Sequence, residues 1–259
     1  MKIATWNINS IRLRLNLLET LATQTSPDVI CLQETKTPDE SFPQEKIKKI
    51  GYPYIAFSGQ KSYNGVGILS KYPIKNIFSS NFYNNDKRHI AATIQDIEIH
   101  NFYVPAGGDE PDVFTNAKFK HKLEYIKLIH RWFLKHRSEN DKIVLLGDLN
   151  IAPHQNDVWS SSQLKNVVSH TSIEKELLLD FKNAFKFIDS ARHFTNIDQK
   201  LYSWWSYRNK DWQKSNRGRR LDHIWVSLPL KNRLKSIVTL KESRNWNRPS
   251  DHVPLIVHL

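Results

Sequence analysis

The sequence predicts an α/β domain, and three observations support that prediction. A strand, an amphipathic helix and a second strand follow one another over residues 2–33, an order typical of a parallel crossover. The run Ile143–Leu146 is apolar throughout, as in a strand buried on both faces. Residues 52–104 alternate between apolar and polar and are punctuated by turn residues, which indicates antiparallel hairpins. A mixed sheet structure is therefore expected.

The elements of the first half follow from these patterns. The opening crossover consists of a strand over residues 2–9, a helix with leucines at helical spacing over 12–23, and a short buried strand over 29–32. The hairpin region contains four alternating runs, at residues 54–58, 66–70, 90–95 and 97–104.

The second half repeats this order loosely. A long amphipathic helix is expected from Phe114 to Arg137, followed by the buried strand and a second helix near Glu174–Phe187. Two strands at 221–226 and 235–240 and a terminal strand after the turn at 249–254 complete the chain. We predict a single domain over residues 1–259, made of two similar halves.

The composition limits the class of protein. With 259 residues, 39% of them hydrophobic, the chain has enough apolar material for a sizeable core. Its single cysteine, Cys31, excludes an internal disulfide framework and a multi-cysteine zinc site, and its apolar neighbours predict a buried structural thiol. Polar residues interrupt every early apolar run, and no stretch approaches the length of a transmembrane helix. A cytoplasmic location, near the nucleoid in a bacterium, is expected.

The charge predicts a polyanionic partner. Lys plus Arg number 38 against 26 for Asp plus Glu, a formal net charge of +12. Nucleic acid is favoured over a membrane surface because no basic amphipathic helix stands out. The alternative is that the lysines only solvate the surface, and composition leaves it open.

Polar side chains gather where the predicted strands begin or end. They are Asn7, Glu34, Tyr103, Asp148, Asn150, Asp222, Asp251 and His252. In α/β sheets, ligands bind in the crevice beyond the strand ends, although plain turns also favour Asp and Asn. Oxygen and imidazole donors without a thiol suit Mg²⁺, with Mn²⁺ as an alternative, better than zinc.

The same groups are suited to water attack on a phosphodiester, since that reaction needs a metal, a base and hydrogen-bond donors for the charged transition state. The sequence lacks HExxH, a phosphate-binding loop ending in Lys-Ser/Thr, and GxSxG. Zinc peptidases, P-loop nucleotidases and α/β-hydrolases are thereby excluded.

Six segments in this order resemble the motifs of the exonuclease III family of abasic-site endonucleases, within the DNase I-like phosphodiesterases. They are Thr5–Asn9, Leu32–Lys36, Asn101–Pro105, Gly147–Pro153, Leu221–His223 and Ser250–His252. The resemblance runs from residue 2 to 258. It implies a four-layer α/β sandwich, with two mixed sheets packed face to face, helices outside and a site at one rim.

The resemblance also implies roles for individual residues. Glu34 matches the metal-binding glutamate of the family, and Asp148 matches the aspartate that orients or deprotonates the attacking water. Tyr103 is expected near the scissile phosphate, and His252 should contact that phosphate while paired with Asp222. The candidate metal contacts are Asn7, Glu34, Asp148, Asn150, Asp251 and His252, with Asn150 also a candidate phosphate or nucleophile contact.

Substrate recognition follows the same comparison. Trp204 and Leu221, with Trp205 beside them, match an apolar pocket for a flipped abasic sugar, which is too small for a nucleotide that carries a base. The basic loop Arg208–Arg220 is expected to enter a DNA groove, although a solvated basic turn is the alternative. The further candidate DNA contacts are Asn9, Arg208, Trp212 and Arg217.

The function implied is a Mg²⁺-dependent DNA-repair phosphodiesterase. It would incise duplex DNA 5′ to abasic sites to leave a 3′-hydroxyl, clean blocked 3′ ends and degrade DNA 3′→5′, acting as a monomer without a membrane partner. One departure from the family is Ala106, which stands where many members carry an amide; backbone N–H groups of Gly107 and Gly108 are expected to substitute. Two alternatives are a phosphodiesterase of the same fold acting on lipid or inositol phosphates, and a non-catalytic nucleic-acid-binding module.

Overall fold

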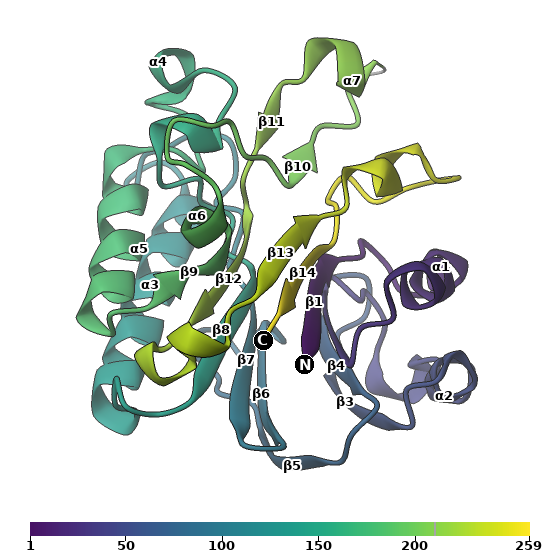
Figure 1. Cartoon of the computed structure of the whole chain (residues 1–259). Helices are drawn as coiled ribbons and strands as arrows, with labels where there is room; N and C mark the ends of the chain where they lie inside the picture. Colours follow the sequence, from purple (N-terminus) through teal and green to yellow (C-terminus); the bar gives the residue numbers. More distant parts are fainter. Residues whose placement is uncertain (210) are drawn as a thin grey trace.

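Two six-stranded sheets face each other between two layers of helices in the structure, a computed structural model that describes residues 1–209 and 211–259 (Figure 1). Apolar side chains from both sheets, such as Ile3, Ile68, Val144 and Ile224, form a central core between them. Cys31 lies in that core, fully buried, as predicted. The predicted four-layer α/β sandwich is confirmed.

Both sheets are mixed. The first has the order β13-β14-β1-β2-β4-β3 and contains β1 (Lys2–Asn7), β2 (Val29–Gln33), β3 (Tyr54–Ser58), β4 (Val66–Ser70), β13 (Ser236–Thr239) and β14 (Leu255–His258). The second has the order β5-β6-β7-β8-β12-β9 and contains β5 (Ile74–Phe78), β6 (His89–Ile94), β7 (Ile97–Tyr103), β8 (Ile143–Asp148), β9 (Ile188–Asp189) and β12 (Asp222–Val226). A two-stranded ribbon, β10 (Trp204–Trp205) with β11 (Gly218–Arg219), stands above the second sheet (Figure 1).

The two sheets share one pattern of pairing. Each is centred on a parallel pair, β1 with β2 and β7 with β8, and antiparallel strands flank that pair on both sides. The termini lie together within the first sheet, where the backbone amide of Leu259 donates to the carbonyl of Met1 at 2.9 Å.

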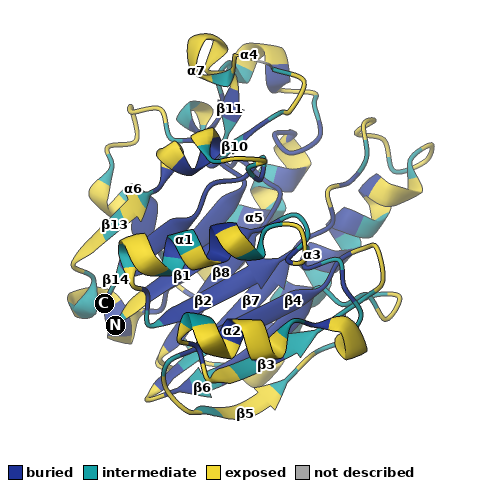
Figure 2. Ribbon diagram, turned by 90° about the vertical axis from the view of Figure 1, so that its right-hand side faces the viewer, coloured by how far each residue is buried: buried dark blue, intermediate teal, exposed yellow. Residues whose placement is uncertain are grey.

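Helices cover the outer faces of the sheets. The helices are α1 (Leu15–Thr25), α2 (Gln44–Ile50), α3 (Ala117–His136), α4 (Ser161–Leu164), α5 (Ser172–Ala184), α6 (Ser190–Phe194) and α7 (Trp212–Ser215), with 3₁₀ turns at residues 39–41, 155–157, 228–233 and 241–245. Helices α1 and α2 pack on the first sheet, with their exposed faces outward (Figure 2). Helices α3 and α5 pack on the second sheet.

Local chemistry sets the boundaries that differ from the predicted ones. Helix α3 begins at Ala117 rather than Phe114, because the Asn116 side chain accepts from the backbone amides of Lys118 and Phe119. Helix α5 begins at Ser172 rather than Glu174, because Thr171 and Glu174 form a capping box. Helix α2 and strand β5 were not predicted.

The buried strand predicted over Ile143–Leu146 extends to Asp148, so that Gly147 lies within β8. Its φ is +132°, and a Cβ there would lie only 1.9 Å from the carbonyl oxygen of Phe102. Only glycine allows this close approach of β8 to β7.

Within the described residues, no helix is both long enough and apolar enough to cross a membrane.

Candidate active site

Strand direction brings the polar strand-end residues to one rim. The carboxyl ends of β1 and β2 lie at the same edge because the two strands are parallel, and the same holds for β7 and β8. Strand β12 runs antiparallel to β8, so its first residue, Asp222, pairs with the last residue of β8, Asp148. Tyr103, at the end of β7, pairs with Asp148 from the other side.

Asn7 connects the two sheets at this rim. Its side-chain nitrogen donates to Glu34 Oε1 at 2.8 Å and to Asp148 Oδ2 at 2.9 Å, and it lies 3.4 Å from His252 Nε2. Asn7 is fully buried. One amide thus ties carboxylates from opposite sheets to the same point.

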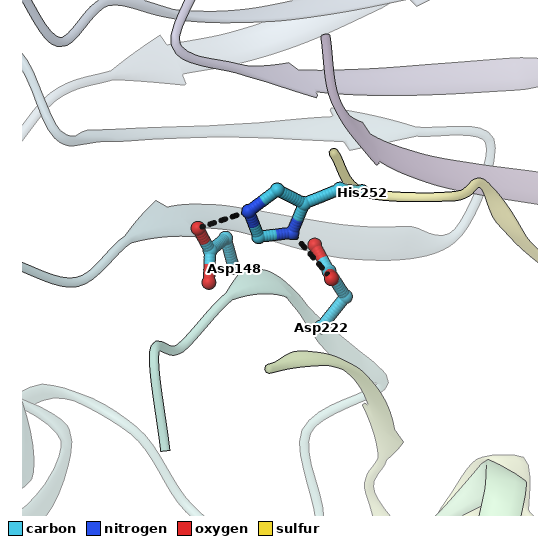
Figure 3. A group of neighbouring side chains, drawn as sticks. All are labelled: Asp148, Asp222 and His252. Atoms are coloured by element: carbon cyan, nitrogen blue, oxygen red, sulfur yellow. Dashed lines mark hydrogen bonds and ion pairs between the residues drawn. The ribbon is translucent and has the colours of Figure 1, made fainter. Parts of the chain in front are cut away.

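His252 lies between two carboxylates (Figure 3). Its Nδ1 is 2.7 Å from Asp222 Oδ2, and its Nε2 is 3.7 Å from Asp148 Oδ2. Ser203 Oγ donates to the same Asp222 oxygen at 2.7 Å, which fixes that carboxylate. Burial works against the charged ring, but Asp222 and Asp148 outweigh it and raise the pKa of His252 to about 10. His252 is therefore an imidazolium at neutral pH.

Asp148 and Asn150 lie side by side, although Asn150 lies outside β8 and strand alternation therefore does not explain their contact. The backbone leaves the strand in between, since Asn150 has a φ of +53°, and the Asn150 side chain reaches back to Asp148 Oδ2 at 3.1 Å. Burial raises the pKa of Asp148 to about 7; His252 opposes that shift and the charge of Asp222 adds to it. Asp148 can therefore exchange a proton near neutral pH.

Glu34 remains ionised at the cavity. Burial would raise its pKa, but Lys36, 2.7 Å from Oε2, and the amide of Asn7 hold it below its usual value. By contrast, burial and the neighbouring charge of Glu34 raise the pKa of Tyr103, so that its phenol stays protonated. The guanidinium of Arg88 lies over the Tyr103 ring, 4.6 Å from its centroid.

Asp251 completes the group. The indole nitrogen of Trp204 donates to one of its oxygens at 3.0 Å, and Asn9 donates to the other at 3.2 Å. Burial would raise its pKa, but His252 and these hydrogen bonds outweigh burial and lower it. The predicted residue Asn9 thus lies beside the site and also accepts from Lys36 at 2.6 Å.

These side chains open into a cavity of about 230 Å³. Trp204 and Leu221 line it, as the resemblance implied, together with Val168 and Arg219. Trp205, in contrast, is fully buried and packs on Tyr202 and Val253. Its place in the pocket was predicted wrongly, because alternate residues of the short strand β10 point to opposite sides.

The basic loop contributes to the rim only in part. Arg208 and Arg217 line a second, larger cavity that adjoins the first. Trp212 instead packs on Trp205, with 5.0 Å between ring centroids. It is not among the described residues that line either cavity. Arg220 is buried in ion pairs with Asp157 and Asp189, so the prediction that it would face a DNA groove is wrong.

A buried ion pair behind the cavity was not predicted. Lys122 of α3 and Glu174 of α5 are fully buried, with 2.5 Å between Nζ and Oε1. Lys122 donates to the carbonyls of Asn150 and Ala106, while Glu174 accepts from the backbone amide of Ser169. The pair thus holds three loops that line the cavity. A charged residue on an amphipathic helix usually faces solvent, so only the Thr171–Glu174 capping pattern signals this region in the sequence.

The donor set fits a hard divalent cation. Glu34, Asp148 and Asp251 bring carboxylate oxygens to the cavity, and the side chains of Asn7 and Asn150 lie beside them, each with its amide nitrogen directed at Asp148. Asp148, Asp222 and His252 also offer donor atoms within 4.8 Å of one another. Because Asp222 and Asp148 favour the protonated form of His252, the carboxylates around Glu34 are better placed as ligands than the imidazole.

Comparison with known proteins gives a consistent result. The model of the endonuclease/exonuclease/phosphatase family matches residues 4–252. The chain is 30% identical to exodeoxyribonuclease III of Haemophilus influenzae over 98% of both proteins. It superposes on an AP endonuclease from Archaeoglobus fulgidus with a TM-score of 0.93 and 31% identity, covering 99% of this chain and 98% of the other. It also matches the 3′ phosphatase NExo from Neisseria, solved with a product DNA hairpin, with a TM-score of 0.91 and 30% identity over 100% and 99% of the two chains.

Proposed function

Because this chain belongs to the endonuclease/exonuclease/phosphatase family, in its exonuclease III branch, we propose that it is a Mg²⁺-dependent DNA-repair phosphodiesterase. It incises duplex DNA on the 5′ side of an abasic site, leaving a 3′-hydroxyl, and it removes 3′-blocking groups and digests 3′ ends. The names of its relatives, an exodeoxyribonuclease, an AP endonuclease and a 3′ phosphatase, support these three activities.

One observation carries the proposal. The amide of Asn7 bonds Glu34 and Asp148 together, and Asp148 lies beside an imidazolium that Asp222 holds in place. An ionised carboxylate, a carboxylate that exchanges protons near pH 7 and a fixed cation within one cavity are the groups that hydrolysis of a phosphodiester requires.

Each residue then has a role in water attack on phosphorus. Asp148 orients the attacking water and accepts its proton as the bond from phosphorus to the 3′-oxygen breaks, and the departing oxygen takes a proton from solvent water to become the 3′-hydroxyl. Asn150 holds Asp148 in position through its side-chain amide. His252 and the protonated phenol of Tyr103 donate hydrogen bonds to the non-bridging oxygens, where negative charge accumulates.

Glu34 is the principal ligand for Mg²⁺ or Mn²⁺, with Asn7 and Asp251 next to it; the bound cation supplies positive charge that stabilises the phosphate in the transition state. Asp148, Asn150 and His252 also appear in the ligand set implied by the sequence. We assign Asp148 to the water, His252 to the phosphate and Asn150 to the support of Asp148 instead, since Asp148 bonds Asn7 and Asn150, and the neighbouring carboxylates favour a protonated His252.

The cavity supports selection of an abasic sugar. Its volume of about 230 Å³ lies below the roughly 300–1,000 Å³ of pockets that enclose drug-sized ligands. Trp204 and Leu221 give it an apolar wall, against which a sugar without its base can pack. Asn9, Arg208 and Arg217 are proposed as further DNA contacts. Action as a monomer and a cytoplasmic location near the nucleoid stay predictions.

A labelled duplex with one abasic site tests the proposal. We expect a single cut 5′ to the site in Mg²⁺, a product that a DNA polymerase can extend, and loss of the reaction in EDTA. A phospholipid assayed in parallel should remain intact. Full activity in EDTA, or hydrolysis of the lipid but not of the DNA, would contradict the proposal.

A further inference from the structure

A second cavity adjoins the catalytic one and is more than twice as large. Its volume is about 580 Å³, against about 230 Å³ for the catalytic cavity. Among the described residues, Gly108, Val168, Trp204 and Arg219 line both cavities, so the two lie side by side. Arg208 and Arg217, proposed above as DNA contacts, line the larger cavity, but none of the groups assigned to the water attack on phosphorus does so.

The wall of the second cavity carries two stacked pairs of a guanidinium and an indole. Arg217 lies over the ring of Trp159, 4.8 Å from the centroid, and Arg219 lies over the ring of Trp204 at 5.5 Å. Both tryptophans are half-buried. Flat aromatic and guanidinium surfaces are those on which unpaired nucleic-acid bases stack.

Backbone pairing holds these side chains in place. The amide of Trp159 donates to the carbonyl of Gly218 at 3.1 Å, and Val158 forms an isolated β-bridge with Arg219. The Arg219 guanidinium donates to the carbonyl of Val168 at 3.0 Å and to Ser169 Oγ at 2.8 Å. The stacking surfaces are therefore formed before a ligand arrives, which lowers the entropy cost of binding.

The charge of the wall suits a nucleotide. Arg208, Arg217 and Arg219 line the second cavity, against the single carboxylate of Asp109. The phosphate of a nucleotide next to the scissile phosphate would lie among these arginines, and the base of that nucleotide would contact the stacked guanidinium–indole pairs.

We propose that the second cavity is a subsite for an unpaired, base-bearing nucleotide next to the scissile phosphate. The proposal rests on the proposed function, since it takes the catalytic cavity to hold the abasic sugar or the blocked 3′ end. A neighbour in an intact duplex must first leave its stack, which costs a few kcal/mol. Lesions whose neighbour is already unpaired should therefore be processed faster.

The test compares cleavage of three abasic duplexes. In the first, both neighbours of the lesion are paired; in the second the 5′ neighbour, and in the third the 3′ neighbour, faces a mismatch. We expect kcat/KM to rise about tenfold for one of the two mismatched substrates. Trp159→Leu should abolish that gain and leave kcat/KM on the fully paired duplex unchanged. Trp159→Phe, which keeps an aromatic ring, should retain the gain.

Trp132→Leu is the matched control. Trp132 on α3 also carries a stacked guanidinium, Arg137 at 4.8 Å, but it packs against Phe133 away from both cavities. That variant should keep the gain. Equal kcat/KM on all three substrates, or a gain that survives Trp159→Leu, would overturn the proposal.

A crosslinking experiment keeps the proposal testable without turnover. The 5′ or 3′ neighbour is replaced by 5-iodouracil, bound by the Asp148→Asn protein and irradiated. Crosslinks should map by mass spectrometry to Trp159 or Trp204 from one of the two positions. Crosslinks confined to other residues would refute the subsite, while the absence of cleavage by the wild-type protein would count against the proposed function alone.

Discussion

Replacement of Lys122 by methionine should destabilise the protein strongly, because it leaves a buried carboxylate without its partner. Lys122 and Glu174 are both fully buried, and the ammonium also donates to the carbonyls of Asn150 and Ala106 at 2.7 and 3.2 Å. Removal of one member of a buried ion pair costs about 3–5 kcal/mol. In a chain of this size, such a loss lowers Tm by roughly 10 °C.

The control for this variant is Lys127→Met on the same helix. Lys127 pairs with Glu124 at 2.9 Å, but both side chains are partly exposed to solvent, at 40% and 35%. Exposed pairs contribute about 0–1 kcal/mol. We expect Tm to change by no more than about 3 °C in that variant.

A double variant separates the charge from the loop contacts. Glu174→Gln keeps an acceptor for the amide of Ser169 and removes the buried charge. The free energy of unfolding of the double variant, Lys122→Met with Glu174→Gln, should be about 2 kcal/mol higher than that of Lys122→Met alone, as measured by urea unfolding. Incision should still be reduced about tenfold or more in both variants at a temperature where they are folded, since the carbonyls of Asn150 and Ala106 lose their donor. A Lys122→Met protein as stable as Lys127→Met would refute the reasoning.

Three further predictions concern the site and the effect of pH. Asp222→Asn removes the carboxylate that raises the pKa of His252 to about 10, so the alkaline limb of kcat against pH should move to lower pH; an unshifted limb would argue against the imidazolium. Glu34→Gln should raise the Mg²⁺ concentration for half-maximal incision at least about tenfold, and an unchanged requirement would remove Glu34 as principal ligand. Burial lowers the pKa of His223 to about 4 from its ordinary 6.5, so its contribution to stability is present above pH 6.5 and is lost as pH falls through 4. A His223→Gln protein should therefore lose about 2 kcal/mol less stability than the wild type between pH 7 and pH 4.5, as measured by urea unfolding; equal losses in the two proteins would contradict this reasoning. Below pH 4 the wild type should lose further stability, because Asp157, held at a pKa of about 2 by two arginines against the effect of burial, becomes protonated.

The residues of the candidate site were predictable because each lies next to the start or the end of a strand. Buried strands are visible as short apolar runs, and parallel pairing brings their carboxyl ends to one edge. Motif spacing therefore located Glu34, Asp148 and His252 before any contact was known. The resemblance to the exonuclease III family, rather than strand position, placed Trp204 and Leu221 in the cavity wall.

What the sequence did not predict depends on contacts between distant elements. Lys122 follows the polar spacing of an amphipathic helix, so its burial arises only because α3 packs against α5 and three loops. Nothing in the sequence of the basic loop distinguishes Arg217 from Arg220. Arg220 is buried because it forms ion pairs with Asp157 and Asp189, which come from other parts of the chain. Strand β5 was missed because three of its five residues are exposed and its apolar pattern is short.

The most direct measurement of the central claim is incision of an abasic duplex by the Asp148→Asn protein, with binding of the same duplex measured alongside. Asp148 lies within hydrogen-bond reach of Asn7 and Asn150 and next to the imidazolium of His252, so the amide variant keeps the shape of the site and loses its proton acceptor. We expect incision to fall about 100-fold or more while the Kd for DNA changes less than about threefold. Incision at the wild-type rate by a folded Asp148→Asn protein would contradict the account.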